Sequence, residues 1–281
     1  MHRLPPLRSN GGMASKDIQP ILEGWSYEPG RITVRKIMGR DSTIKIQMRV
    51  DLGVLQMEPT GRPDGQRPEG FESHLERHVH RLREHVERHE TDLGFFLAPE
   101  DCRQLREEAA LYYQRYLALL VLEDYEGVVR DTSRNLQVVD FCHKYALEES
   151  DRLILEQFRP YLIMMNTRAQ AHQALNVDEP RKAMAMVDRG LRRIRRHFEE
   201  AGRPEAYERS GEVQLLNEFR SKVSRRLPSD PVSQLRRRLV RAVDAERYED
   251  AARLRDEIER LLSSARVEPT FRGDRQEVSP D

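Results

Sequence analysis

Cysteine, aromatic side chains and net charge are all scarce in this sequence of 281 residues. Its two cysteines, Cys102 and Cys142, are too few and too far apart for a zinc ribbon or a disulfide framework, and they fit a reduced, cytoplasmic setting. Aromatic residues make up 6% of the chain and charged residues 34%, which is typical of helical proteins with modest cores. The 48 basic and 48 acidic side chains cancel, so no overall field draws the protein to nucleic acid or to a membrane.

Long apolar runs and catalytic motifs are also missing. No run reaches the roughly 18 apolar residues that a membrane helix needs, and the first residues lack the apolar core of a secretion signal. There is no GxSxG, HExxH, Walker or GIY-YIG-like motif, and no pair of neighbouring cysteines. We therefore expect a protein that is not an enzyme and that holds neither a cofactor nor a metal ion.

The sequence pattern divides the chain into five segments. Residues 1–20 and 265–281 are polar and without periodicity, so we expect a disordered N-terminal segment and a flexible tail. Residues 21–95 are expected to form a small β-meander followed by a helix, residues 96–227 a helical platform, and residues 228–264 a helical hairpin. The expected fold class is mainly α, with a small antiparallel sheet near the N-terminus.

Alternation of apolar and polar residues predicts the sheet. It runs over residues 32–37 and 44–50, and residues 54–57 form a third short run. Turn residues separate the runs at 39–41 and 51–53.

Three strands alone are marginally stable. We therefore expect one face of the sheet to pack on the apolar stripe of the helix that follows. The strand face consists of Ile44, Ile46, Met48 and Val50. The helical stripe consists of Leu75, Val79, Leu82 and Val86.

A loop and a histidine-rich helix follow the sheet. The loop 61–70 is rich in glycine and proline and presents Arg62 and Arg67, and we favour a connector over a recognition loop. The helix over 71–92 carries two i, i+4 histidine pairs, a spacing that can bind Zn²⁺ or Ni²⁺. Neighbouring arginines would repel a cation, so a solvated helix face is favoured and metal binding or pH sensing is the alternative. The four histidines are His74, His78, His85 and His89.

The middle of the chain predicts successive helices with short breaks. Residues 120–131 resemble the mid-repeat turn of tetratricopeptide repeats, and Ala171 and Ala183 resemble the small packing positions of that family. The resemblance implies a helical-repeat platform, although no full repeat period recurs. The expected helices span 99–122, 124–147, 149–175, 179–201 and 204–227.

The last periodic stretch predicts two short amphipathic helices across a tight turn. Leu235, Leu239 and Val243 share one face of the first helix, and a second apolar stripe begins after Tyr248. An aromatic residue and Glu are followed by Ala-Ala-x-Leu-Arg-Asp-x-Ile-x-x-Leu. The residues of the pattern are Leu235, Leu239, Ala245, Tyr248, Glu249, Ala251, Ala252, Leu254, Arg255, Asp256, Ile258 and Leu261.

This hairpin resembles the UVR motif, which is known from bacterial UvrB and UvrC. The resemblance implies an element that docks on a protein partner, either another UVR-containing protein or a second copy of this chain, and it does not imply an enzyme. The nuclease and helicase domains of UvrC and UvrB have no counterpart in the sequence. The residues expected to bind the partner are Leu235, Leu239, Val243, Tyr248, Leu254, Arg255, Asp256, Ile258 and Leu261.

Basic residues outnumber acidic ones between residues 181 and 241. Such a face can bind phosphate backbones or an acidic protein, although few aromatic residues interleave with it. The residues in question are Arg189, Arg192, Arg193, Arg196, Arg237 and Arg241. The sequence thus favours a cytoplasmic adaptor for protein partners. The alternative is an accessory factor that binds nucleic acid and is linked to excision repair.

Overall fold

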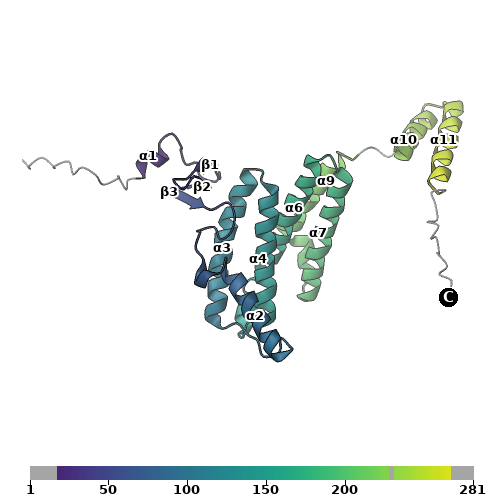
Figure 1. Ribbon diagram of the computed structural model, residues 1–281. Helices are drawn as coiled ribbons and strands as arrows, with labels where there is room; N and C mark the ends of the chain where they lie inside the picture. Colours follow the sequence, from purple (N-terminus) through teal and green to yellow (C-terminus); the bar gives the residue numbers. More distant parts are fainter. Residues whose placement is uncertain (1–17, 228–230, 267–281) are drawn as a thin grey trace, which may run out of the picture. The chain divides into compact units, whose positions relative to one another are not determined.

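The computed structural model describes residues 18–227 and 231–266 of the chain. The chain forms two compact units, residues 1–225 and 226–281, which are described separately (Figure 1). The disorder expected for residues 1–17 and the flexible tail expected for 267–281 lie outside the described residues. The first element, α1 (Gln19–Leu22), is a single helical turn.

The antiparallel meander is confirmed. Its strands are β1 (Val34–Met38), β2 (Ile44–Val50) and β3 (Gly53–Met57), in the order β1-β2-β3. Pairing of Val34 with Met48 and of Ile46 with Met57 sets the register. This register places Ile46, Met48 and Met57 in the core.

The helix on which the sheet packs was predicted wrongly. β2 packs on α3 (Pro99–Val121), and not on α2 (His74–His89), whose Val86 is 38% exposed. The physical reason is an anchor at the end of β3. Arg115 of α3 donates hydrogen bonds from Nη1 to the carbonyl oxygens of Glu58 (3.0 Å) and Gly61 (2.7 Å), which holds this end of the sheet against α3.

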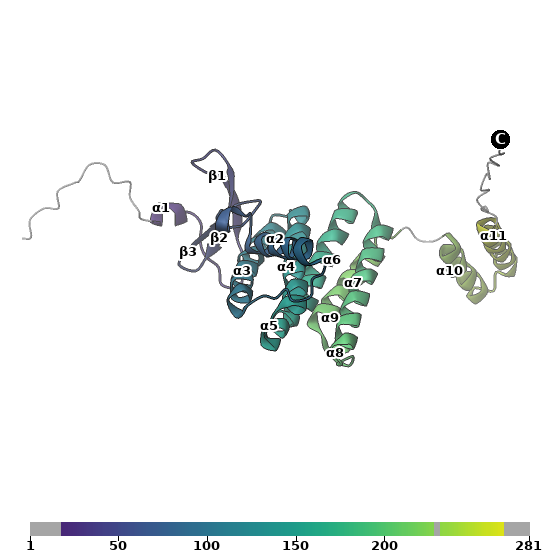
Figure 2. The ribbon, with the colours of Figure 1, turned by 60° about the horizontal axis from the view of Figure 1, so that its bottom comes forward.

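Helices pack in chain order through the rest of the first unit. α3 packs on α4 (Tyr125–Tyr145), α4 on α6 (Arg159–Asn176), α6 on α7 (Pro180–Glu200), and α7 on α9 (Gly211–Ser224) (Figures 1 and 2). Described residues 99–227 contain no strand, as predicted. No helix in the described part of the chain is long and apolar enough to span a membrane.

Two helices predicted as continuous are broken. The segment 149–175 begins with α5 (Glu149–Leu153), which Figure 2 shows as a helix separate from α6. The 3₁₀ turn η2 (Glu156–Phe158) follows α5 before α6 starts. Pro160 explains this break, because proline is tolerated in the first turn of a helix and disrupts a helix interior. The segment 204–227 divides into α8 (Ala206–Arg209) and α9, and Ser210 caps α9 by accepting a hydrogen bond from the Val213 amide.

Small residues let α6 and α7 approach closely. Ala171 and Ala183, the two positions that resemble tetratricopeptide repeats, are both fully buried. A Cβ atom at Gly190 of α7 would lie 2.3 Å from Oγ1 of Thr167 on α6, so no larger residue fits without a shift. These contacts suit a stack of helical hairpins, and the specific resemblance to tetratricopeptide repeats stays a prediction.

A buried ion pair lies in the core between α3 and α4. Neither Arg115 nor Asp131 is exposed to solvent, and the carboxylate accepts from Nε at 2.7 Å and from Nη2 at 2.8 Å. Arg130 adds a further hydrogen bond from its Nε to Asp131 at 2.9 Å. One guanidinium group therefore joins α3, α4 and the end of the sheet.

Candidate partner-binding site

The second unit is a helical hairpin. α10 (Pro231–Asp244) and α11 (Tyr248–Arg266) pack on each other and are joined by a short turn (Figure 1). Glu246 adopts the left-handed conformation (φ 59°), and the Arg247 amide donates to the carbonyl oxygen of Ala242 at 2.8 Å. This geometry ends α10 and reverses the chain.

Small and aliphatic side chains fill the interface between the two helices. Leu235 and Ala242 of α10 are buried, as are Ala251 and Ile258 of α11. Leu239 and Leu254 are half-buried at the edges of the interface. The hairpin thus buries one narrow stripe from each helix.

Several of the residues expected to bind a partner lie outside that stripe. Val243 is 47% exposed, because Ala242 occupies the inward position one residue earlier, and Tyr248 at the start of α11 is 67% exposed. Val240 and Leu262 are exposed as well. We call these four side chains the apolar flank of the hairpin, and its area is available to a partner.

Arg255 and Asp256 lie on the outer surface of α11. Arg255 Nη2 lies 3.3 Å from Oδ1 of Asp256, and both side chains are mostly exposed. An exposed ion pair of this kind contributes little to stability. These two residues are accessible to a partner and are not part of the interior of the hairpin.

Comparison with known protein families identifies the hairpin. Residues 230–263 match the family model described as the UvrB/uvrC motif.

The chain carries a UVR motif.

This match covers the hairpin and no part of the first unit. No curated protein and no solved structure matches the chain. The UVR motif is an interaction motif of excision-repair proteins.

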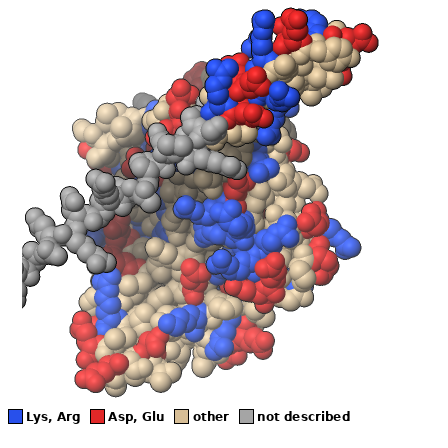
Figure 3. Space-filling model, turned by 90° about the vertical axis from the view of Figure 1, so that its right-hand side faces the viewer, with Lys and Arg blue, Asp and Glu red and all other residues tan. Residues whose placement is uncertain are grey.

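The basic face predicted on α7 is present. Arg189, Arg192, Arg193 and Arg196 are all exposed, and none of them forms an ion pair or a hydrogen bond within the described residues. Lys and Arg side chains gather on the side of the molecule that is turned toward the viewer in Figure 3. In the hairpin, Arg241 is exposed, whereas the side chain of Arg237 lies outside what the structure describes.

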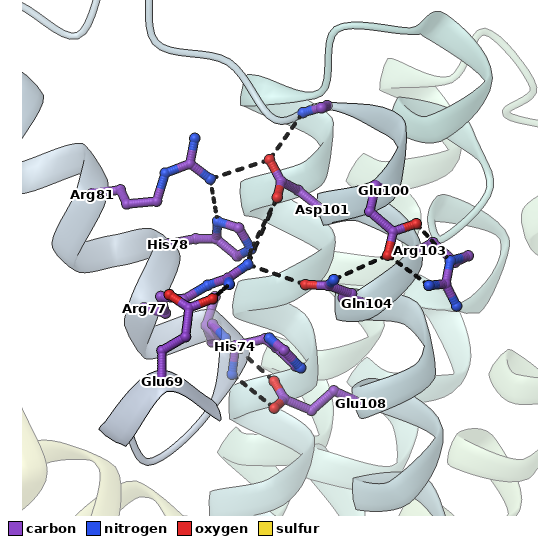
Figure 4. A network of polar contacts seen from close by, with 12 residues as sticks. Glu69, His74, Arg77, His78, Arg81, Glu100, Asp101, Arg103, Gln104 and Glu108 are labelled. Atoms are coloured by element: carbon purple, nitrogen blue, oxygen red, sulfur yellow. Dashed lines mark hydrogen bonds and ion pairs between the residues drawn. The ribbon is translucent and has the colours of Figure 1, made fainter. Parts of the chain in front are cut away.

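The histidine-rich helix holds a polar network that the sequence did not predict (Figure 4). Glu108 of α3 is fully buried and accepts hydrogen bonds from the backbone amides of His74 (2.8 Å) and Leu75 (3.3 Å). Its carboxylate also pairs with Arg134 of α4 and lies 3.4 Å from Nε of Arg62. A carboxylate at this position accepts hydrogen bonds from the first amides of α2, which have no partner within the helix. Its negative charge also interacts favourably with the positive N-terminal end of the helix dipole.

Loop 61–70 is bound to this network at one end. Arg62 is turned inward and also lies 3.3 Å from Asp64, whereas Arg67 is exposed. The loop therefore presents one of its two arginines to solvent.

His78 contradicts the prediction of a solvated histidine face. It is fully buried; Arg81 Nη1 lies 2.9 Å from its Nδ1 and Arg77 Nη2 lies 3.1 Å from its Nε2 (Figure 4). Asp101 lies 3.8 Å from its Nε2. The helix wheel placed His78 beside the apolar stripe, and packing of α2 on α3 covers it.

The other three histidines are partly or wholly accessible. His74 and His85 are half-buried and His89 is exposed. His85 Nε2 lies 2.9 Å from the carbonyl oxygen of Leu93. No group of three or more potential metal ligands occurs in the described ranges 18–227 and 231–266.

Burial lowers the pKa of His78 to about 4, and the positive charges of Arg77, Arg81 and His74 add to this effect while Asp101 opposes it. The folded protein therefore favours the neutral ring, whereas the unfolded chain takes up a proton below the ordinary pKa of 6.5. Stability from this group is complete above that value and is lost as the pH falls toward about 4.

A change from pH 7 to pH 5 is expected to lower the free energy of unfolding of the wild-type protein by about 2 kcal/mol more than that of a His78→Gln variant. Urea unfolding of both proteins at the two pH values measures this difference. Ionisable groups that do not interact with His78 contribute equally to both proteins, so the difference reports His78 together with its interaction with His74. An identical pH dependence of the two proteins would contradict the assignment.

Two further features were missed at the sequence level. Cys102 of α3 and Cys142 of α4 are both buried and free, and interaction with Cys142 lowers the pKa of the Cys102 thiol, although the residues lie far apart in the sequence. A cavity of about 440 Å³ opens between α3, α4, η2 and α6 and is lined by Tyr113, Tyr116 and Tyr161. The concentration of tyrosine in a chain with few aromatic residues was the only signal of this cavity.

Proposed function

We propose that this protein is a non-enzymatic adaptor that docks protein partners through its UVR hairpin. The observation that carries the proposal is the apolar flank of the hairpin, which the two helices leave exposed. The match to an interaction motif supports it. The two free, buried cysteines fit a reducing compartment such as the cytoplasm.

The partner is a second helical hairpin, on another copy of this chain or on another UVR-containing protein. A facing hairpin would cover the apolar flank in a four-helix contact, and two copies of this chain could do so about a twofold axis. Arg255 and Asp256 are exposed beside this surface and would orient the contact more than they would strengthen it. The helical platform of the first unit is the second surface of the adaptor.

Val243→Asp combined with Tyr248→Asp is expected to abolish partner capture by the full-length protein. Both side chains are exposed, so the hairpin should stay folded, and a carboxylate at each position would be desolvated against an apolar partner. The measurements are affinity capture on the immobilised full chain and sedimentation equilibrium for self-association. Circular dichroism reports whether the hairpin remains helical.

Val177→Asp is the matched control, because Val177 is 66% exposed on the first unit. It should capture the same partners as the wild-type protein. Capture of identical partners by the double variant, or by a chain that ends at residue 227, would remove the hairpin as the docking site.

A second candidate function is binding of nucleic acid by the α7 face. The observation that favours it is the set of four exposed arginines that form no ion pair or hydrogen bond within the described residues. When such groups bind the phosphates of a nucleic acid, they release the counterions condensed on it, which favours binding at low salt.

Arg192→Glu combined with Arg196→Glu is expected to weaken binding to any DNA or RNA sequence about equally and to flatten the dependence on salt. Fluorescence anisotropy with labelled duplex and single strands, at several salt concentrations, measures both effects. The control is Arg103→Glu, because Arg103 lies on α3 and already pairs with Glu100 and Glu107. Absence of measurable affinity of the wild-type protein at low salt would end this candidate.

A further inference from the structure

The cavity of the first unit is deep and has aromatic walls. Its volume of about 440 Å³ falls in the range of roughly 300–1,000 Å³ that is usual for small-molecule sites. Tyr116 lines it and is only 1% exposed, whereas Tyr113 and Phe158 are 39% and 50% exposed. The space therefore has a covered floor and an open mouth.

Tyrosine rings form one continuous side of the cavity. The ring of Tyr113 meets that of Tyr116 edge to face, with centroids 5.4 Å apart, and lies 6.4 Å from that of Tyr161. Leu155 and Leu162 add aliphatic surface. A flat, mostly apolar molecule complements walls of this kind.

The charged and amide groups at the cavity are already paired. Arg106 forms an ion pair with Asp151 of α5. Asn135 donates from Nδ2 to the carbonyl oxygen of Ala109 at 2.9 Å, and its Oδ1 accepts from Arg134. The cavity therefore offers no free charge to a ligand, which favours an uncharged one.

The tyrosine hydroxyls are different. Within the described residues, the hydroxyls of Tyr113, Tyr116 and Tyr161 have no hydrogen-bond partner. Burial raises the pKa of Tyr116 well above its ordinary value, so this hydroxyl stays protonated and can donate. A protonated phenol without a protein partner can donate a hydrogen bond to an acceptor atom on a molecule bound in the cavity.

From these observations we infer that the cavity between α3, α4, η2 and α6 is a binding site for a small, uncharged, planar and mostly apolar molecule with a hydrogen-bond acceptor. The aromatic walls hold the body of the ligand. A tyrosine hydroxyl donates to its acceptor. The site belongs to the first unit and is independent of partner docking by the hairpin.

The test uses Nile red, an uncharged planar dye that carries a carbonyl acceptor, titrated into the full-length protein and followed by fluorescence. One molecule is expected to bind per chain. Ala110→Trp, which places a large ring at the cavity wall, should weaken binding at least tenfold. Tyr116→Phe keeps the ring and removes the hydroxyl, so it should weaken binding about three- to tenfold through loss of one hydrogen bond.

Matched controls separate the cavity from other apolar surface. Ala185→Trp places the same ring at an exposed position on α7, and Tyr27→Phe removes an exposed hydroxyl near the sheet. Both should bind Nile red as the wild-type protein does. The anionic dye 8-anilinonaphthalene-1-sulfonate should bind at least tenfold more weakly than Nile red, because no free cation meets its charge.

Three results would overturn the inference. They are failure of the wild-type protein to bind Nile red, unchanged affinity in Ala110→Trp, and equal or tighter binding of the anionic dye. The melting temperature of each variant is measured first. If Ala110→Trp does not fold, unchanged affinity in Tyr116→Phe overturns the inference instead.

Discussion

Replacing Asp131 with alanine is expected to lower the free energy of unfolding by about 3–5 kcal/mol. The Asp131 carboxylate accepts two hydrogen bonds from Arg115, and both residues are fully buried. Without Asp131, the guanidinium charge stays in the core with no counter-charge of comparable geometry. Removal of one member of a buried pair costs far more than the pair itself contributes.

Urea unfolding at pH 7 measures this loss. Asp140→Ala is the matched control, because Asp140 pairs with Arg159 at the surface and is 65% exposed; it should cost less than about 1 kcal/mol. A loss of similar size in both variants would contradict the role assigned to the buried pair.

A double variant separates the contribution of the ion pair to stability from that of the hydrogen bonds by which Arg115 anchors the sheet. Arg115→Met with Asp131→Leu removes both charges, which by itself is often close to neutral. It also leaves the carbonyl oxygens of Glu58 and Gly61 without their donor. We therefore expect the double variant to recover only part of the lost stability.

Replacing Glu108 with alanine is expected to cost about 3–5 kcal/mol and to loosen α2 in particular. This carboxylate is the acceptor for the first amides of α2, and it is also the counter-charge of Arg134. The alanine variant leaves the positive end of a helix and a largely buried cation without a partner. Glu108→Gln keeps an acceptor and should cost less.

Glu107→Ala is the control for this prediction. Glu107 is the preceding residue of α3 and is exposed beside Arg103, so its loss should change stability by less than about 1 kcal/mol. Urea unfolding gives the total effect, and hydrogen exchange of the amides over residues 74–89 gives the local one. Normal protection of these amides in Glu108→Ala would contradict the capping role.

The extent of sequence prediction differs from element to element. Strands and most helices were predicted because their patterns repeat over neighbouring residues. The prediction of one helix over 149–175 is wrong because the apolar periodicity continues across Pro160. Proline disrupts a helix interior and fits only in the first turn, so a new helix begins at Arg159. In the hairpin, the four-residue spacing of Leu235, Leu239 and Val243 predicts that Val243 faces inward, yet the structure buries Ala242, seven residues after Leu235, and leaves Val243 exposed.

The sequence by itself determined the local elements and the UVR motif, because the contacts that define them join residues a few positions apart. Only the tertiary structure decided which faces are covered. The sheet lies on α3, His78 is buried and three tyrosines surround a cavity, because α3 and α4 bring together residues that are many positions apart. Periodicity shows that a helix has an apolar face, and it carries no information about which element covers that face.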